Sequence, residues 1–160
     1  MVKSSQQTVL DDIDKAILRA LQMNGGLSNV ELARAVKLSP PATHTRVRRL
    51  EKGGYIRNYT AIVDREKAGY DLLCFIHIGM QLHQFEQVEK FRAAIRKLPE
   101  VLECHHITGE YDYILKVALR NRKDLERFVV DRLTPMPGVA RIHTSLVFSE
   151  IKSTTALPLE

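Results

Sequence analysis

The chain has 160 residues, of which 44% are hydrophobic and 27% charged. That balance is typical of folded proteins and excludes a disordered chain, and the length suits one domain or two small ones. We expect no signal peptide, because the first residues lack a long apolar run and a small-residue cleavage site. Every apolar stretch falls far short of the about 20 residues that cross a bilayer. Two cysteines are too few for a disulfide framework. We therefore expect a soluble cytoplasmic protein with no membrane partner.

The net charge of +5 lies entirely in the first part of the chain. Residues 1–60 hold ten Lys or Arg against five Asp or Glu, whereas residues 61–160 hold fourteen of each kind. The excess is densest over 28–60, with seven basic residues against two acidic ones. A basic part beside a neutral part suggests a polyanionic partner for one domain only. The charge alone is equally compatible with a solvated basic surface.

Three short helices are predicted in the first third of the chain. The first begins near Asp11 or Asp12 and ends at Asn24-Gly25-Gly26, because glycine adopts the left-handed conformation of a helix end. Its apolar residues recur at helical spacing: Leu10, Ile13, Ile17, Ala20 and Leu21. The second helix opens at Ser28, which can form a capping box with Glu31. The third begins at Ser39-Pro40, runs to about Lys52 and ends at Gly53-Gly54.

The third helix has the character of a helix that reads double-stranded DNA. Thr43, Val47 and Leu50 share its buried face, and the opposite face carries small residues first and cations later. A small first turn can enter the major groove while the cations reach phosphates. The predicted DNA-binding residues are Ser39, Pro41, Ala42, His44, Thr45, Arg46, Arg48, Arg49 and Lys52. The alternative is a three-helix segment with no DNA role.

A strand is expected after the double glycine, over residues 55–63, because Tyr55, Tyr59 and Ile62 favour extended structure. This strand could serve as a wing, as a connector, or as both. It would close a first domain over residues 10–63. A second domain would then occupy residues 64–160.

The second domain alternates between strand and helix periodicity. Strands are predicted over 72–82, 101–108, 111–119 and 139–148, and helices over 84–98 and 121–133. The core stripe of the first of these helices is Phe85, Val88, Phe91, Ile95 and Leu98. The order βαββαβ predicts a ferredoxin-like α+β domain, with two helices on one face of an antiparallel sheet. We expect the other face to be apolar and to pair with a second copy in a dimer.

Five short motifs along the chain resemble those of a known protein family. They are Leu27-Ser28-Asn29-Val30-Glu31-Leu32, Leu38-Ser39-Pro40, Arg46-Val47-Arg48-Arg49-Leu50-Glu51, Gly109-Glu110-Tyr111-Asp112-Tyr113 and Pro137-Gly138-Val139. Together they resemble the Lrp/AsnC (leucine-responsive, feast/famine) transcriptional regulators from about Leu10 to Glu150. The resemblance implies a winged helix-turn-helix joined by a strand to a RAM-type βαββαβ domain. It also implies homodimers that assemble into octamers and bind an amino acid between dimers.

The resemblance implies an effector site at the turn over residues 109–112. The predicted effector-binding residues are Thr108, Gly109, Glu110, Tyr111, Asp112 and, on the last strand, Ser145. Backbone N–H groups around Gly109 can bind a carboxylate, and Asp112 can accept hydrogen bonds from the ammonium group of leucine or another small amino acid. Without the resemblance, the preferred interpretation is a tight hairpin in which the glycine only permits a positive φ.

Other chemistries have weaker support. Cys104-His105-His106 invites a metal site, but alternate strand residues face opposite ways, and the two ligands left on one face do not make a site. Hydrolase, zinc-protease and P-loop motifs are missing, so we expect no enzyme, no metal and no cofactor beyond an amino-acid effector. Three functions remain: an effector-responsive transcriptional regulator, which we prefer, an architectural DNA-binding protein, and a small ferredoxin-like enzyme with an incidental helical arm.

Overall fold

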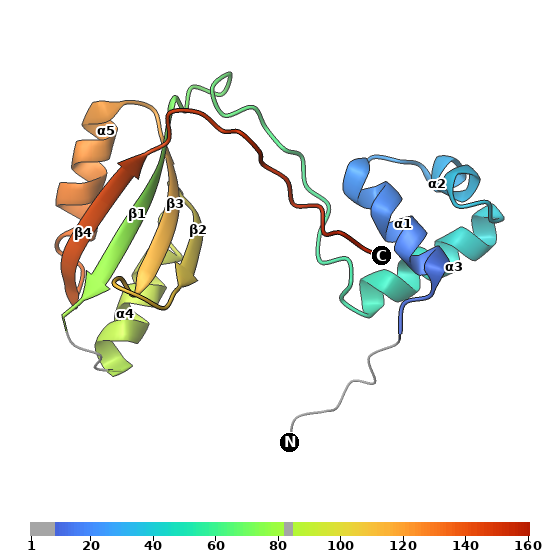
Figure 1. Ribbon diagram of the computed structural model, residues 1–160, viewed down its shortest axis with the longest axis horizontal. Coiled ribbons are helices and arrows are strands. Elements are labelled where there is room, and N and C mark those ends of the chain that lie inside the picture. The colour runs from blue at the N-terminus through green and yellow to red at the C-terminus, as the bar shows by residue number, and fades with distance from the viewer. Residues whose placement is uncertain (1–8, 82–84) are drawn as a thin grey trace. The chain divides into compact units, whose positions relative to one another are not determined.

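The computed structural model describes residues 9–81 and 85–160, and these fall into two units. The first unit contains the chain up to Ile62 together with Lys152–Glu160, and the second is Val63–Ile151 (Figure 1). None of the described helices is long and apolar enough to cross a membrane.

The first unit is built on three helices that begin where predicted, and the predicted ends of the first and third are confirmed as well. They are α1 (Asp12–Met23), α2 (Asn29–Ala35) and α3 (Pro40–Lys52). Capping fixes each start: Ser28 and Glu31 form the expected capping box, and the Ser39 hydroxyl accepts a hydrogen bond from the amide of Ala42 at 3.4 Å. The core of this unit is a cluster of four buried apolar side chains: Ile17, Leu18, Leu32 and Leu50.

The expectation of a strand over residues 55–63 is wrong, because these residues lie in neither a helix nor a strand. A strand requires a hydrogen-bonded neighbour, and the four described strands pair only with one another. Instead, the first residues of this segment pack against the three helices. Ile56 contacts the three-helix core, and the hydroxyl of Tyr59 donates a hydrogen bond to Glu51 Oε1 at 3.3 Å.

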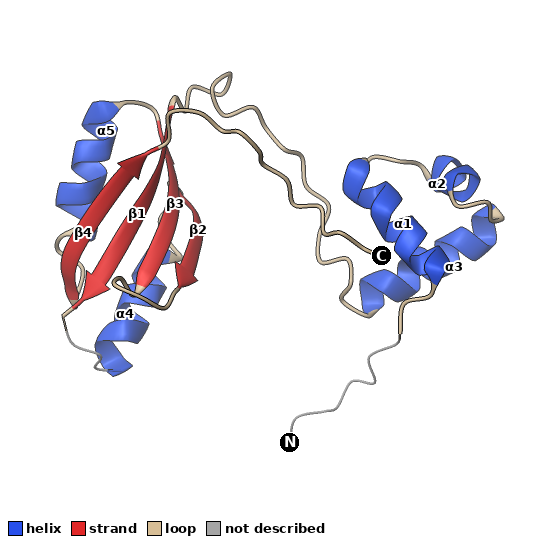
Figure 2. Ribbon diagram, in the orientation of Figure 1, coloured by secondary structure: helices blue, strands red, loops and turns tan. Residues whose placement is uncertain are grey.

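The second unit has the predicted ferredoxin-like order. Its elements are β1 (Leu72–Met80), α4 (Phe85–Ile95), β2 (Val101–His106), β3 (Tyr113–Leu119), α5 (Arg122–Arg127), a π-helical segment η1 (Phe128–Leu133) and β4 (Val139–Leu146). The strands form one antiparallel sheet in the order β2-β3-β1-β4 (Figure 2). The predicted fold class is confirmed in this unit.

Alternation along the strands sends one set of side chains toward the helices. Ile76 lies opposite Leu115 in the register of the sheet, and both are fully buried against Phe91 of α4 and Phe128 of η1. The stripe expected for the first helix is wrong at Phe85, which begins α4 and is 80% exposed. Periodicity alone does not show where along its length a helix leaves the core. Leu82, the last residue of the strand predicted over 72–82, lies outside the described residues.

The other face of the sheet is uncovered by helices, but it is not the apolar surface that we expected. The strand registers of β1, β3 and β4 place on it the side chains of Leu73, Phe75, His77, Ile114, Lys116, Ala118, Arg141, His143 and Ser145. Four of these nine side chains are apolar and five are polar or charged, and His77 and His143 lie side by side on neighbouring strands. The face therefore offers hydrogen-bonding groups as well as apolar contact area.

Gly138, which ends the break before β4, provides a test of how tightly this unit is packed. Its φ is +81°, and a Cβ atom there would lie 2.7 Å from Met80 Cε. We expect Gly138→Ala to lower the free energy of unfolding by about 1–3 kcal/mol, mostly from backbone strain, because Met80 Cε is the end of a flexible side chain that can partly move aside. Gly69→Ala is the matched control, because Gly69 has φ +84° but open space around it, so only about 1 kcal/mol is expected. Equal losses in urea denaturation would contradict the overlap.

Candidate functional site

The outer face of α3 gathers the residues predicted to bind DNA. All of them are exposed except Arg46, which is half-buried. A shallow hollow of about 590 Å³ runs along this face and is lined by Pro41, His44, Thr45, Arg48, Arg49 and Lys52. The first turn of the helix carries small side chains, and cations follow. The geometry therefore presents an open, basic helix surface with no acidic side chain among those that line the hollow.

The four cations of α3 differ in how firmly they are held. Arg46 Nη1 lies 2.6 Å from Asp11 Oδ2 and 2.9 Å from Asp14 Oδ1, and Arg49 also pairs with Asp14. Asp14 is only 1% exposed. Arg48 reaches Glu51 at 3.5 Å, and Lys52 has no ion pair within the described residues. Arg48 and Lys52 are thus the more available cations, whereas Arg46 and Arg49 join α3 to α1.

This ion-pair cluster was missed by the sequence reasoning. Helical spacing assigns Arg49 to the solvent face and Arg46 to its flank, but it does not show that α1 brings a buried carboxylate to them from 35 and 32 residues away. The hydrogen bond from Arg46, with the backbone N–H of Asp14, holds the pKa of Asp11 below its ordinary value. Two acids in the first turn of the first helix were the available signal.

The predicted effector turn lies in a loop over residues 107–112 that joins β2 to β3. The loop is longer than the two residues left between the predicted strands 101–108 and 111–119, because β2 ends at His106 and β3 begins at Tyr113. A hydrogen bond from Ile107 N to Asp112 O, at 2.9 Å, closes it. Thr108, Gly109 and Glu110 are exposed, and Gly109 adopts φ +119°.

Asp112 ties this loop to the end of β1. Its carboxylate Oδ2 accepts a hydrogen bond from Met80 N at 2.7 Å, and its own amide donates to Ile78 O at 2.9 Å. The side chain is half-buried. Asp112 therefore has a structural role that the turn motif did not reveal, and any ligand contact that it makes comes in addition to this one.

Arg141 of β4 was not among the predicted effector residues, yet it contacts the loop directly. Its Nη2 donates a hydrogen bond to Glu110 O at 2.9 Å, and its guanidinium lies 5.3 Å from the centre of the Tyr111 ring. Gly79 lies opposite on β1, where a Cβ atom would approach Arg141 Nε to 3.2 Å. A glycine inside a strand was the signal in the sequence for a side chain that crosses it.

A cluster of aromatic rings connects the loop with Ser145. The rings of His77 and Tyr111 lie 5.4 Å apart, those of His77 and His143 5.7 Å, and those of Tyr111 and His143 6.1 Å. Ser145 Oγ lies 3.4 Å from His143 Nε2. His77 Nδ1 is buried and has no hydrogen-bond partner among the described residues. Arg141, these rings and the loop together make a polar surface at one end of the uncovered sheet face.

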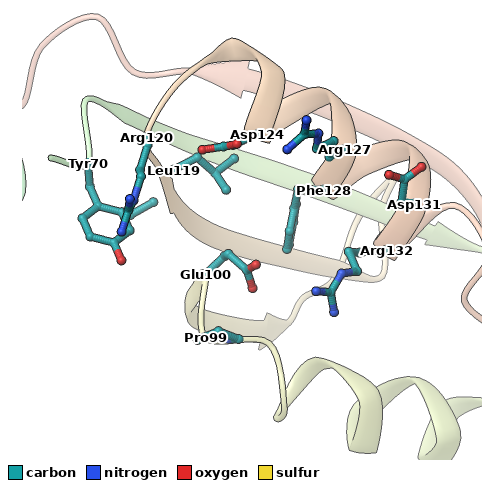
Figure 3. Close-up of a pocket in the computed structure, with 11 residues that line it drawn as sticks. Tyr70, Pro99, Glu100, Leu119, Arg120, Asp124, Arg127, Phe128, Asp131 and Arg132 are labelled. Carbon is teal, nitrogen blue, oxygen red and sulfur yellow. The ribbon is translucent and has the colours of Figure 1, made fainter.

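A separate pocket of about 440 Å³ lies beside α5 and η1 (Figure 3). Glu100, Phe128 and Arg132 lie around it, and Arg120 is placed over the ring of Tyr70 at 5.6 Å. Within the described residues, one carboxylate oxygen of Glu100 is buried without a hydrogen-bond partner. None of the predicted effector residues lines this pocket, so it is the main alternative location for a small ligand.

The Cys104-His105-His106 run does not converge on one point. His105 faces the side of Ile114 and pairs with Glu103 at 3.0 Å, whereas His106 stacks on Tyr113 at 4.8 Å between ring centres. No cluster of metal-ligating side chains occurs in the part of the chain that the structure describes. The two histidines therefore have separate structural contacts, and Cys104 is exposed.

Two family models match this chain. Residues 10–57 match a winged helix-turn-helix DNA-binding domain, and residues 73–157 match the Lrp/AsnC ligand-binding domain. The Leucine-responsive regulatory protein of Salmonella typhimurium is 38% identical, over 94% of this chain and 92% of that protein. Transcriptional regulator AzlB of Bacillus subtilis is 35% identical, over 95% of this chain and 97% of that protein.

Solved structures agree with these matches. The Neisseria meningitidis transcriptional regulator NMB0573, in complex with L-Met, is 40% identical and superposes with a TM-score of 0.92 over 94% of this chain and 97% of that one. Escherichia coli AsnC is 27% identical, with a TM-score of 0.84, over 94% of this chain and 99% of that one. With both domains matched in order and the fold shared over nearly its full length, this chain belongs to the Lrp/AsnC family of DNA-binding transcriptional regulators.

Proposed function

We propose that α3 reads an operator with the nine predicted residues and that Arg48 and Lys52 supply the main phosphate contacts. The observation that carries this proposal is the exposed hollow along α3, whose lining is basic or small. The first turn would meet base edges, with His44 and Thr45 setting base preference. The cations beyond it would meet the backbone on either side of the groove.

Arg48→Ala is expected to weaken DNA binding by about three- to tenfold on all sequences and to reduce the slope of log K against log salt by about one. Arg48 is 67% exposed and holds only a long contact with Glu51, so its loss leaves the fold intact. Arg96→Ala is the matched control, because Arg96 is an exposed arginine of the other unit. Fluorescence anisotropy across a salt series measures the DNA affinity and its salt slope for each variant. An unchanged salt slope for Arg48→Ala would contradict the assignment of α3 as the DNA-reading helix.

We propose that the effector of this chain is an α-amino acid with an aliphatic or thioether side chain. The Neisseria relative is described as a complex with L-Met, and the matched domain is a ligand-binding domain of this family. Thr108, Gly109, Glu110, Tyr111, Asp112 and Ser145 remain the proposed contacts, and Arg141 joins them. The guanidinium of Arg141 and the amides around Gly109 suit the carboxylate, while Asp112 suits the ammonium group.

A thermal-shift screen of the twenty amino acids tests this proposal on the full chain. L-methionine and L-leucine are expected to raise the unfolding temperature, because a ligand that binds only the folded state stabilises it by RT ln(1 + c/Kd), where c is the free ligand concentration. A footprint confined to a few sites, altered by the same amino acid, would establish an effector-responsive regulator. Uniform wrapping without any amino-acid response would favour the architectural function instead.

We propose further that the uncovered sheet face pairs two copies and that the dimers assemble into octamers with effector between them. The face combines Phe75 and Ile114 with the histidine pair, so it supplies both apolar area and hydrogen-bonding groups. We also propose that the protein works as two functional domains, a DNA-binding domain over residues 10–63 and a regulatory domain over residues 64–160. We propose in addition that it acts in the cytoplasm and catalyses no reaction. Sedimentation of the full chain at micromolar concentration tests assembly, and a monodisperse monomer would overturn it.

A further inference from the structure

Leu157 and Leu159 contact α1, and the polar part of this contact is made with their backbone groups. The side-chain amide of Gln22 donates from Nε2 to Leu157 O at 3.1 Å and accepts from Leu157 N at Oε1, at 2.6 Å. One side chain thus satisfies both polar groups of one residue, as a neighbouring strand would. Arg19, one turn earlier, donates from Nη1 to Leu159 O at 2.7 Å. Figure 1 shows the end of the chain reaching the three helices.

The apolar part of the contact comes from Leu159. Its half-buried side chain packs against the core cluster of Ile17, Leu18, Leu32 and Leu50. The side chain of Leu157 is 69% exposed, so that position is recognised through its backbone alone. The segment therefore adds a hydrogen-bonded residue and an apolar anchor to the three-helix unit.

The segment is suited to docking in an extended form. Pro158 fixes its own φ and biases Leu157 toward extended conformations, which lowers the entropy lost when the segment binds. The Thr154 hydroxyl accepts a hydrogen bond from Ala156 N at 3.1 Å and orders the residues that precede the contact. Both features lie within the segment and do not depend on side chains of α1.

We propose that the face of α1 formed by Arg19 and Gln22 is a receptor for residues 156–159, and that the docked segment is a tether through which the effector domain acts on the DNA-binding unit. The chain passes between the two units once near residue 62 and again near residue 151. The second passage follows β4, the strand that carries Arg141, His143 and Ser145. A change in β4 on effector binding would reach α1 directly through the tether. The coupling rests on the effector site proposed above.

Hydrogen exchange tests the docking by itself, with no effector present. Gln22→Ala is expected to speed exchange of the Leu157 amide by roughly tenfold or more, because its acceptor is removed. Met23→Ala is the matched control on the same helix, since Met23 is 84% exposed and takes no part in the contact. If the Leu157 amide of the unchanged protein already exchanges at the rate of an unfolded chain, the receptor assignment is overturned.

Coupling is tested by measuring operator affinity with and without L-methionine in the full chain, in Gln22→Ala and in a chain lacking residues 152–160. The amino acid is expected to bind all three within about twofold, while the ligand-induced change in operator affinity disappears in the two altered proteins. An undiminished response in the shortened chain would overturn the tether. If L-methionine and L-leucine do not bind the unchanged protein at all, the proposed effector site fails and the coupling with it, and hydrogen exchange still decides the docking.

A synthetic peptide of residues 152–160 separates a tether from a simple stabiliser. Added in excess to the shortened chain, it is expected to restore the unfolding temperature of the DNA-binding unit, because it can occupy the same face of α1. It should not restore the response to L-methionine, because it lacks the covalent connection to β4. Recovery of both by the free peptide would overturn the tether and leave only a stabilising segment.

Discussion

Replacing Arg46 and Arg49 together by alanine is expected to lower the free energy of unfolding of the DNA-binding unit by about 3–5 kcal/mol. Both guanidinium groups contact Asp14, whose carboxylate is 1% exposed. Without them a buried charge would have no cation beside it, and that cost exceeds the loss of two surface ion pairs. Thermal and urea denaturation followed by circular dichroism would measure the change.

A third substitution shows whether the loss of stability comes from the unpaired charge of Asp14 or from the lost contacts between α1 and α3. Adding Asp14→Leu to the double substitution is expected to recover more than half of the loss, because no unpaired charge is left in the core. Arg48→Ala with Lys52→Ala is the matched control on the same helix and should change stability by less than about 1 kcal/mol. If the control lowers the free energy of unfolding as much as the Arg46 and Arg49 double substitution does, then the unpaired charge of Asp14 does not explain the loss.

The same cluster makes the unit sensitive to acid. Arg46 lowers the pKa of Asp11, so the stabilisation from this carboxylate is present above its ordinary pKa and is lost as the pH falls through the lower, folded value. The double arginine variant should lose this part of the acid dependence.

It also follows that reduced DNA binding by Arg49→Ala has two sources, a lost cation and a weakened helix pair, whereas reduced DNA binding by Arg48→Ala has one source, the lost cation.

Asp112→Ala is expected to reduce amino-acid affinity by about 2–4 kcal/mol, because a charge-assisted bond to the ammonium group is lost. It should also destabilise the regulatory unit by about 1–3 kcal/mol, since Met80 N loses the acceptor that it has at 2.7 Å. Calorimetry would measure the first effect and denaturation the second. The substitution alone therefore does not separate ligand binding from folding.

Asp112→Asn makes that separation. An amide oxygen can still accept from Met80 N, so the fold should survive while the negative charge is lost. Arg132→Ala is the companion variant at the pocket beside η1. Binding abolished by Asp112→Asn and kept by Arg132→Ala supports the loop site, whereas the reverse pattern moves the effector to that pocket.

Local chemistry in the sequence determined most of the elements of this protein. The caps at Ser28 and Ser39, the paired glycines and the alternation along β1 predicted three helices and a βαββαβ order that the structure confirms. These signals act over one to four residues, so they need no knowledge of the rest of the chain. The outward face of α3 was predictable for the same reason.

Tertiary structure alone decided which side chains meet. Asp14 reaches Arg49 across 35 residues, Arg141 crosses Gly79 to hold Glu110, and Gln22 binds a segment 135 residues away. Helical periodicity assigned Phe85 to the core, and strand preference assigned residues 55–63 to a strand. Both predictions were wrong, because Phe85 is 80% exposed and none of the described strands pairs with residues 55–63. A local pattern sets which face of an element is apolar or charged. Which partner meets that face depends on chain folding, which brings distant residues within the few ångströms over which hydrogen bonds and buried charges act.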